Sequence, residues 1–280
     1  MAVEIFRLRA WRRLWATIWA LGCVFAVPQA GFAQLEPFET GPGTPVALEL
    51  VLAVDTSSSV SVEEFDLQMR GFSEAFRSIP VIAAIQAHGA GGVAVAMIQW
   101  SDNRRQQIAV DWRLLDDEDS VRAFADAIDA TPRFLDGGGT AIGGAIAFSL
   151  MEIERNGYEG ARKVVDISGD GRANQGAQPE NLRDVAVLSG VTVNGLAILN
   201  EDTSVAAYYR NSVIGGAGAF VMTANDYESF SLAILEKLIK EIGGVPIAGL
   251  RDEGHAGAAE SVPQTAARPV PFGPSGPSGE

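Results

Sequence analysis

Regular alternation of apolar and amphipathic segments is the feature of this sequence that most constrains its fold. Residues 47–54 and 93–100 are almost continuously apolar, whereas residues 62–78 repeat apolar side chains at every third or fourth position. A short apolar run is typical of a strand buried on both faces of a parallel sheet, and the second pattern is typical of a helix that packs on such a sheet. The chain is therefore expected to form an α/β domain.

The same alternation continues through residues 46–244. Further strands are expected at residues 107–112, 163–168, 191–199 and 219–222, and further helices at residues 120–130, 141–155, 179–189, 203–213 and 227–242. The short segment 107–112 follows the preceding strand closely enough to form a hairpin with it. We therefore predict a doubly wound, mainly parallel six-stranded sheet with one short antiparallel edge strand and helices on both faces. Such sheets bind ligands at the carboxyl ends of their strands.

Both ends of the chain differ from this central part. Residues 1–33 resemble an export signal, with four arginines before an apolar run too short to span a membrane, and small residues before a cleavage site after Ala33. Residues 34–45 form a Pro- and Gly-rich lead-in, and residues 245–280 are expected to be a disordered tail rich in Ala, Gly and Pro. These segments predict an exported protein, periplasmic or secreted, with no membrane span after cleavage. An uncleaved anchor is the alternative.

The charge and the cysteine count exclude several classes of function. The 280 residues carry a formal net charge of −14, and loss of four arginines and one glutamate with the signal would bring it to −17. An acidic chain without a basic block is poorly suited to nucleic acid, whose phosphates must be neutralised. The single cysteine, Cys23, excludes a disulfide framework and a cysteine-built metal site, and two histidines leave little room for a histidine-based one.

Oxygen-bearing side chains gather where the first predicted strand ends. Asp55, Ser57 and Ser59 form an Asp-x-Ser-x-Ser pattern at a tight strand-to-helix turn. Capping of the following helix is the alternative reading, because Ser59 or Ser61 could be the cap and Glu64 could complete a capping box with Ser61. Capping explains one or two of these residues, but not all of them.

Two later turns place similar side chains at the same edge of the predicted sheet. Thr140 follows three glycines and opens a helix, which it could cap, or it could present its hydroxyl to a ligand. Asp170 lies in a Ser-Gly-Asp-Gly turn directly after the strand at residues 163–168, as Asp55 does after the first strand. Hydroxyl and carboxylate oxygens suit a hard divalent cation, Mg²⁺, Ca²⁺ or Mn²⁺, rather than zinc.

Together these side chains resemble the metal-ion-dependent adhesion site (MIDAS) of von Willebrand factor A (VWA) domains. That pattern has Asp-x-Ser-x-Ser after the first strand, a threonine in a Gly-rich loop and an aspartate in a later Asp-Gly turn. All five positions match in order and separation: Asp55, Ser57, Ser59, Thr140 and Asp170. The segments VVDISGDG and VTVNGLAILN further resemble an uncharacterised bacterial subgroup of exported VWA-like proteins.

The resemblance implies a mechanism as well as a fold. Ser57, Ser59 and Thr140 would contact the cation, most simply Mg²⁺, while Asp55 and Asp170 would hold it mainly through waters. One coordination position would stay open for a carboxylate from a partner protein. Because the direct ligands are neutral hydroxyls, the cation would keep much of its charge and attract an acidic residue that the rest of the surface repels.

Polar residues at other predicted strand ends are expected to rim the same face and to meet the partner: Trp100, Ser101, Asp102, Asn200 and Asp202. An exposed tryptophan would be a strong anchor. The alternatives are solvated loop residues and, for Trp100, a place in the core.

Two polar residues interrupt otherwise apolar strands. Asp166 and Asn194 lie where a parallel sheet is normally apolar, and a buried carboxylate requires a partner. We interpret both as hydrogen-bonded structural residues, and a second cation site is the alternative.

Enzyme motifs are scarce in the sequence. No Gly-x-Ser-x-Gly nucleophile motif occurs, His88 follows an apolar helical stretch and His255 lies in the tail. Residues 137–144 are rich in glycine but lack the P-loop lysine and the dinucleotide-binding spacing, which argues against a nucleotide. A binding module is therefore favoured over an enzyme. A metal-dependent envelope hydrolase that uses Asp55 and Asp170, or a secreted adhesin for a foreign matrix protein, is the alternative.

Overall fold

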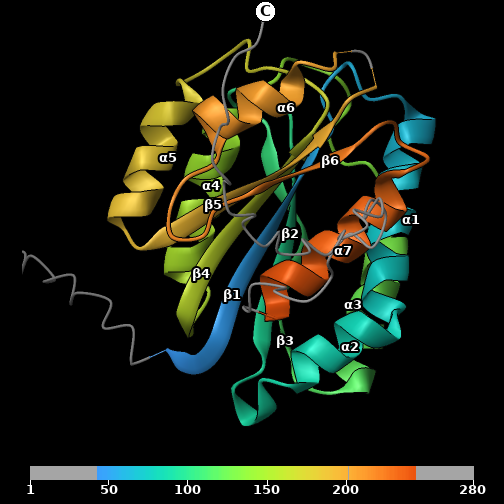
Figure 1. The fold of residues 1–280 in the computed structure, drawn as a ribbon, viewed down its shortest axis with the longest axis vertical. Helices are drawn as coiled ribbons and strands as arrows, with labels where there is room; N and C mark the ends of the chain where they lie inside the picture. Colours follow the sequence, from blue (N-terminus) through green and yellow to red (C-terminus); the bar gives the residue numbers. More distant parts are fainter. Residues whose placement is uncertain (1–42, 201, 244–280) are drawn as a thin grey trace, which may run out of the picture. The chain divides into compact units, whose positions relative to one another are not determined.

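A computed structural model describes residues 43–200 and 202–243, and the predicted export signal and tail lie outside them. The strands form one sheet of six, in the order β3-β2-β1-β4-β5-β6, with only β3 antiparallel to its neighbour (Figure 1). They are β1 (Thr44–Asp55), β2 (Val93–Trp100), β3 (Gln106–Leu115), β4 (Tyr158–Gly169), β5 (Val191–Ile198) and β6 (Val221–Ala224). The predicted fold class is confirmed.

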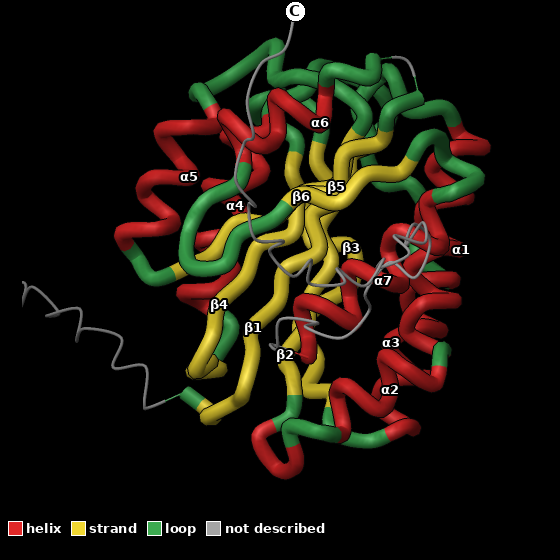
Figure 2. Tube along the Cα trace, viewed as in Figure 1, coloured by secondary structure: helices red, strands yellow, loops and turns green. Residues whose placement is uncertain are grey.

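Helices cover both faces of this sheet (Figure 2). One face carries α1 (Val62–Arg77), α2 (Ile79–Gln86), α3 (Glu118–Asp129) and α7 (Phe230–Gly243). The other face carries α4 (Ile142–Arg155), α5 (Pro179–Leu188), α6 (Val205–Tyr208) and the π-helical turn η2 (Tyr209–Val213). In the described residues, no helix has the length and apolar character needed to cross a membrane.

Strand β1 shows how the pleat divides the core. Leu48, Leu50 and Leu52 lie in the apolar cluster with α1 and α7, whereas Val51 and Ala53 lie in the cluster with α4 and α6. Successive side chains of a strand point to opposite faces. The side chain of Asp55, the last residue of β1, therefore belongs to the α4 and α6 face.

Several elements differ in extent from their sequence-based expectations. The edge strand β3 has ten residues, because it pairs with β2 along its whole length across a bulge. Helix α2 contains the apolar helical stretch expected before His88, and it begins at Ile79 because Ser78 caps it and Pro80 occupies its first turn, where the missing amide hydrogen costs nothing. The helix expected at residues 203–213 is a single α turn followed by η2.

A buried ionic cluster links α7 to the middle of the sheet. Lys237 Nζ lies 2.6 Å from Asp166 Oδ1 and also contacts the Glu241 carboxylate. Asn194 donates a hydrogen bond of 2.9 Å to Glu241 Oε1. All four side chains are buried. Asn194 is hydrogen-bonded as expected, whereas Asp166 is held by its ion pair with Lys237.

One ammonium in this cluster faces two buried carboxylates, so the cluster has an excess of negative charge. Burial and the neighbouring Asp166 carboxylate raise the pKa of Glu241 to about 7. Burial likewise raises the pKa of Asp166, against the opposing effect of Lys237. A raised pKa means that the folded protein holds a proton that the unfolded chain releases at lower pH.

We predict that Glu241 makes folding less favourable as the pH rises. Its contribution is fully favourable below the unfolded pKa near 4.5 and is lost as the pH rises through about 7. The unfolding free energy of the parent should therefore fall by roughly 1–3 kcal/mol between pH 5 and 8 through this group, and Glu241→Gln should not show this decrease. Urea unfolding of both proteins at several pH values measures the difference. Parallel pH profiles would show that Glu241 does not carry this proton.

Candidate metal centre

Asp55 ends the central strand and begins the turn into α1. Its side chain is fully buried, and its Oδ1 accepts a hydrogen bond of 2.7 Å from the Ser57 amide. The Thr56 amide donates to the Trp100 carbonyl at 2.9 Å, so the turn stays attached to β2 one residue beyond the last strand pair. These bonds fix the Asp55 carboxylate under the turn.

Helix α1 is capped by a residue that the metal motif does not use. Ser61 and Glu64 form the predicted capping box, each accepting from the backbone of the other. The hydroxyls of Ser57 and Ser59 are therefore free for another role. They lie 3.2 Å apart, and Ser59 Oγ donates to Asp170 Oδ1 at 2.8 Å.

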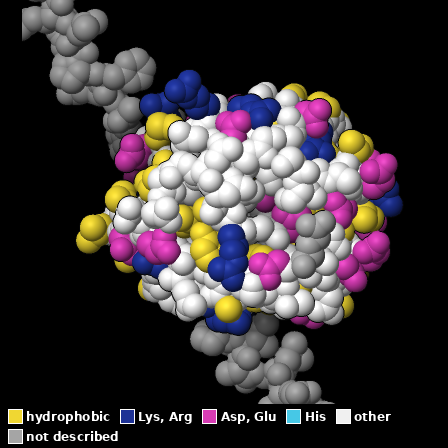
Figure 3. Space-filling model, turned by 90° about the horizontal axis from the view of Figure 1, so that it is seen from above, with side chains coloured by type: hydrophobic (Ala, Val, Ile, Leu, Met, Phe, Trp, Pro, Cys, Tyr) yellow, Lys and Arg dark blue, Asp and Glu magenta, His cyan; other side chains and the backbone are white. Residues whose placement is uncertain are grey.

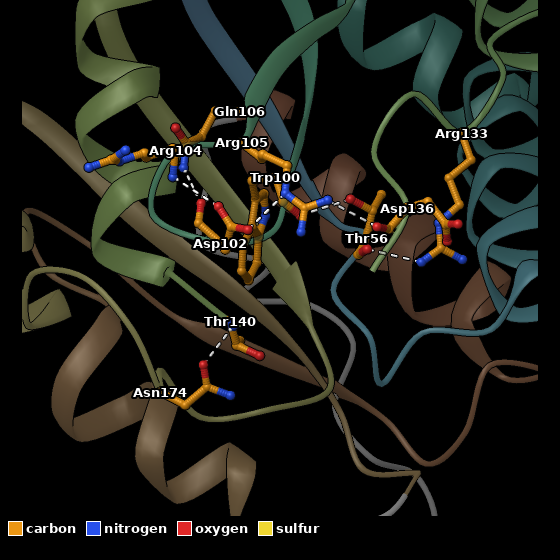
Figure 4. Close-up of polar contacts among 10 residues, drawn as sticks. All are labelled: Thr56, Trp100, Asp102, Arg104, Arg105, Gln106, Arg133, Asp136, Thr140 and Asn174. Atoms are coloured by element: carbon orange, nitrogen blue, oxygen red, sulfur yellow. Dashed lines mark hydrogen bonds and ion pairs between the residues drawn. The ribbon is translucent and has the colours of Figure 1, made fainter. Parts of the chain in front are cut away.

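The Gly-rich loop brings Thr140 to the same place. The Gly138 carbonyl accepts from the Ser58 amide at 3.1 Å, and Gly138 adopts a φ of 106°, which favours glycine. Thr140 does not cap α4, whose N-cap is Ala141. Its amide donates to Asn174 Oδ1 at 2.9 Å, and its side chain is buried (Figure 4).

Asp170 completes the group at the end of β4. Its Oδ2 accepts from the Tyr227 hydroxyl at 3.1 Å, while its Oδ1 accepts from Ser59. A Cβ placed on Gly171 would lie 3.9 Å from Thr140 Oγ1, so Thr140 faces this turn. The structure thus brings all five sequence-selected residues into one cluster. Tyr227 escaped the sequence analysis because no motif marks it and only the return of the chain before α7 places it here.

Among the described residues, no lysine or arginine forms an ion pair with Asp55 or Asp170, although the charge of Arg133 acts on Asp55 from nearby. Burial and the neighbouring Asp170 raise the pKa of Asp55 to about 8, and burial raises the pKa of Asp170. Asp55 Oδ2 is buried and has no hydrogen-bond partner among the described residues. Two buried carboxyl groups with raised pKa values and hydroxyls beside them fit a hard divalent cation, whose charge would stabilise the ionised carboxylates. The described residues offer no group of three or more His, Cys, Asp or Glu side chains for a metal, so a cation here would depend on the hydroxyls.

Two arginines that the sequence analysis did not select hold these loops together (Figure 4). The Arg133 guanidinium donates to the carbonyls of Thr56 at 2.9 Å and Ser57 at 3.2 Å. Arg105 donates to Asp102 Oδ2 at 2.7 Å and to the Asp136 carbonyl at 3.0 Å. The first arginine joins the Gly-rich segment to the Asp55 turn, and the second joins it to the β2–β3 turn.

The prediction that Trp100 and Ser101 face a partner is wrong. Both are fully buried, because β2 lies inside the sheet and Trp100 belongs to the apolar cluster under α4. Asn200 is exposed, and Asp102 and Asp202 are half-buried, each paired with an arginine. Figure 3 shows this end of the molecule, where acidic side chains are spread over the surface with basic ones between them. Partner contact by Asp102, Asn200 and Asp202 stays a prediction.

Comparison with known families places this domain. Residues 45–246 match the family model described as "Protein of unknown function (DUF1194)". The chain belongs to the DUF1194 family. A search among curated proteins finds no match.

Solved structures share the fold of this DUF1194 domain. Proximal thread matrix protein 1 (PTMP1) from the mussel byssus has 19% identity and a TM-score of 0.54, over 72% of this chain and 48% of its own. A von Willebrand factor type A protein from Catenulispora acidiphila has 17% identity and a TM-score of 0.51, over 71% and 43%. The vWF domain of the type V pili tip protein Mfa5 from Porphyromonas gingivalis has 12% identity and a TM-score of 0.51, over 75% of this chain and 100% of that domain.

These likenesses confirm the predicted VWA fold. The DUF1194 chain spans less than half of PTMP1 and of the Catenulispora protein. One PTMP1 structure, with 19% identity and a TM-score of 0.51 over 72% of this chain and 50% of its own, has a zinc-occupied MIDAS motif. At identities this low, the likeness establishes the fold alone.

Helix α4 approaches the loop after Asp170 closely, and this approach predicts a steric requirement for glycine. A Cβ on Gly143 would lie 2.3 Å from the Ala177 carbonyl oxygen, which is backbone and cannot swing away. Gly143→Ala should therefore lower the unfolding free energy by about 1–3 kcal/mol. The control is Gly144→Ala, whose Cβ would lie 3.0 Å from the movable Gln106 side-chain amide. It should be neutral or stabilising, because alanine favours helix over glycine by up to about 1 kcal/mol. Chemical unfolding measures both, and equal effects would contradict the close approach.

Proposed function

We propose that this DUF1194 domain is an exported protein-binding module that holds a divalent cation, Mg²⁺ by preference, and captures an acidic residue of a partner protein. The observation that carries the proposal is the hydroxyl and carboxylate chain from Ser57 through Ser59 to Asp170, beside the buried and uncompensated Asp55. These hydrogen bonds do not explain why two carboxylates lie together, since the two groups repel each other. A cation would neutralise both.

Some residues at this site would bind the cation, and others hold the surrounding loops in place. The hydroxyls of Ser57, Ser59 and Thr140 would hold the cation directly, and Asp55 and Asp170 would hold it mainly through waters. When bound, the cation supplies a Lewis-acidic position for a carboxylate oxygen. Arg133 keeps the Asp55 turn in place through two backbone carbonyls. Asn174 Oδ1 holds Thr140 in place by accepting a hydrogen bond from the Thr140 backbone amide.

Two further observations favour a binding role over hydrolysis. His88, which follows α2, is the one histidine among the described residues. Its Nε2 lies 2.7 Å from the Ile242 carbonyl oxygen of α7, away from the strand ends that carry the cluster. The proteins that share the fold include a byssus matrix protein and a pilus tip protein. Their names support a role in protein assembly outside the cell, in agreement with the predicted export signal at residues 1–33.

Cation binding should stabilise the domain through Asp55. At a Mg²⁺ concentration 100 times the Kd, binding adds about 2.7 kcal/mol, or roughly 5–10 °C in Tm for a domain of this size. Asp55→Ala should gain nothing from Mg²⁺, because it lacks one of the two carboxylates that would hold the cation. Differential scanning calorimetry with Mg²⁺ and with chelator measures both values.

A matched control separates the site from general charge effects. Asp66 is exposed on α1, one turn beyond the same loop, and Asp66→Ala should keep the full response to Mg²⁺. A Mg²⁺ response in Asp55→Ala equal to that of the parent would rule out this site.

Partner capture tests the second half of the proposal. Immobilised domain should retain a protein from native envelope extract in Mg²⁺ and release it in chelator. Bait that carries Asp55→Ala should retain none in either buffer. Retention that is independent of both the metal and Asp55 would contradict capture through the cation. Cleavage of an extract protein without retention would favour the hydrolase.

A further inference from the structure

Two buried polar atoms lie near each other beneath the candidate metal centre, and neither has a hydrogen-bond partner among the described residues. They are Asp55 Oδ2 and the Tyr209 hydroxyl oxygen. A Cβ placed on Gly169 would lie 2.8 Å from each of them. Both atoms therefore border the small space that Gly169 leaves open, and they lie within twice that distance of each other.

Two glycines of the sheet leave room for the Tyr209 ring to approach Asp55. Tyr209 begins η2 on the face that carries α4 and α6, the face to which Asp55 also points. A Cβ on Gly195 of β5 would lie 2.7 Å from Tyr209 Cδ1. The ring thus passes over two glycines on the neighbouring strands β5 and β4 and reaches the carboxylate at the end of β1. A side chain at either glycine would block it.

The two carboxylates of the cluster differ in their hydrogen bonds. Asp170 accepts one bond at each oxygen, from Ser59 and from the Tyr227 hydroxyl. Within the part of the chain that the structure describes, Asp55 accepts one at Oδ1, from the Ser57 amide, and none at Oδ2. A buried hydroxyl left without a partner costs about 1–3 kcal/mol, so a tyrosine that served only to fill the core would be better replaced by phenylalanine.

We infer that Tyr209 is a positioning residue for the cation site: when the cation is bound, its hydroxyl donates to Asp55 Oδ2, directly or through one water, and aims this carboxylate at the cation. The inference rests on the proposed function. Outer hydrogen bonds of this kind fix the orientation of metal-binding side chains, and their loss typically weakens metal binding by a factor of ten or more. Gly169 and Gly195 make the bond possible by carrying no side chain.

The test compares metal affinity with metal-free stability in Tyr209→Phe, which keeps the ring. Mn²⁺ is the probe, and its Kd is measured by titration calorimetry and by paramagnetic resonance of the free ion. Tyr209→Phe should bind Mn²⁺ about tenfold more weakly than the parent. Its metal-free Tm should be unchanged or higher, because the hydroxyl that is lost is buried without a hydrogen-bond partner among the described residues.

Tyr158→Phe is the matched control, since Tyr158 lies at the opposite end of β4 and undergoes the same chemical change. It should bind Mn²⁺ like the parent. Equal affinities of Tyr209→Phe and the parent would overturn the positioning role and leave the cation site intact. A parent that binds no Mn²⁺ would overturn the proposed function, and this inference with it.

A crystal structure of the Mn²⁺-loaded parent gives a second, independent measurement. The Tyr209 hydroxyl should lie within hydrogen-bond distance of Asp55 Oδ2 or of a water that bonds to both. A hydroxyl that bonds elsewhere in the loaded protein would overturn the inference, whatever the behaviour of the phenylalanine variant.

Discussion

The buried carboxylate of Asp55 is the constraint on which the upper end of this domain depends. A charge removed from water costs several kcal/mol unless other groups compensate it. Asp55 ends strand β1 in the middle of the sheet, and its side chain is fully buried. The loops above it are arranged accordingly: the Ser57 amide turns back onto Oδ1, and Arg133 holds the following carbonyls. The Gly-rich loop and the turn at Asp170 lie close to the same strand end, where the Ser58 amide donates to the Gly138 carbonyl and Ser59 donates to Asp170.

The same sheet carries a second buried acidic cluster, and the contrast is informative. Asp166 and Glu241 have the ammonium of Lys237 between them, supplied by α7. Asp55 and Asp170 have no ammonium in contact among the described residues, and the nearest guanidinium, that of Arg133, donates to backbone carbonyls instead. One cluster is therefore neutralised within the chain, apart from a single excess charge, and the other is not. A cation from solution is the simplest complement to the second cluster, because hydroxyls that cannot ionise complete its ligand set.

Sequence patterns predicted the sheet well and the site in part, for reasons that particular residues illustrate. Continuous apolar runs located the inner strands, and four of the five candidate metal-site residues lie at or just after the ends of β1 and β4, whereas Thr140 lies in the loop between α3 and α4. Helix α2 was predicted only as an apolar helical stretch before His88, without a defined start, because Ile79–Gln86 is almost continuously apolar. Trp100 was misplaced because the end of a strand need not reach the surface when the loop after it folds back. Tyr227, Arg133 and Tyr209 reach the cluster from distant segments, and no local pattern reports such contacts.

Under the proposed function, the net negative charge of the chain affects how a partner would be selected. A surface whose net charge is −14 in the full chain repels an acidic partner at long range, and salt in solution screens that repulsion beyond about 10 Å. Attraction would come only from the cation, at contact distance, where neutral hydroxyl ligands leave its charge largely exposed. Long-range steering therefore cannot select the partner. Selection would rest on whether a carboxylate can approach the cation between the loops that carry Asp102, Asn200 and Asp202, which makes the shape of this edge, rather than its charge, the determinant of specificity.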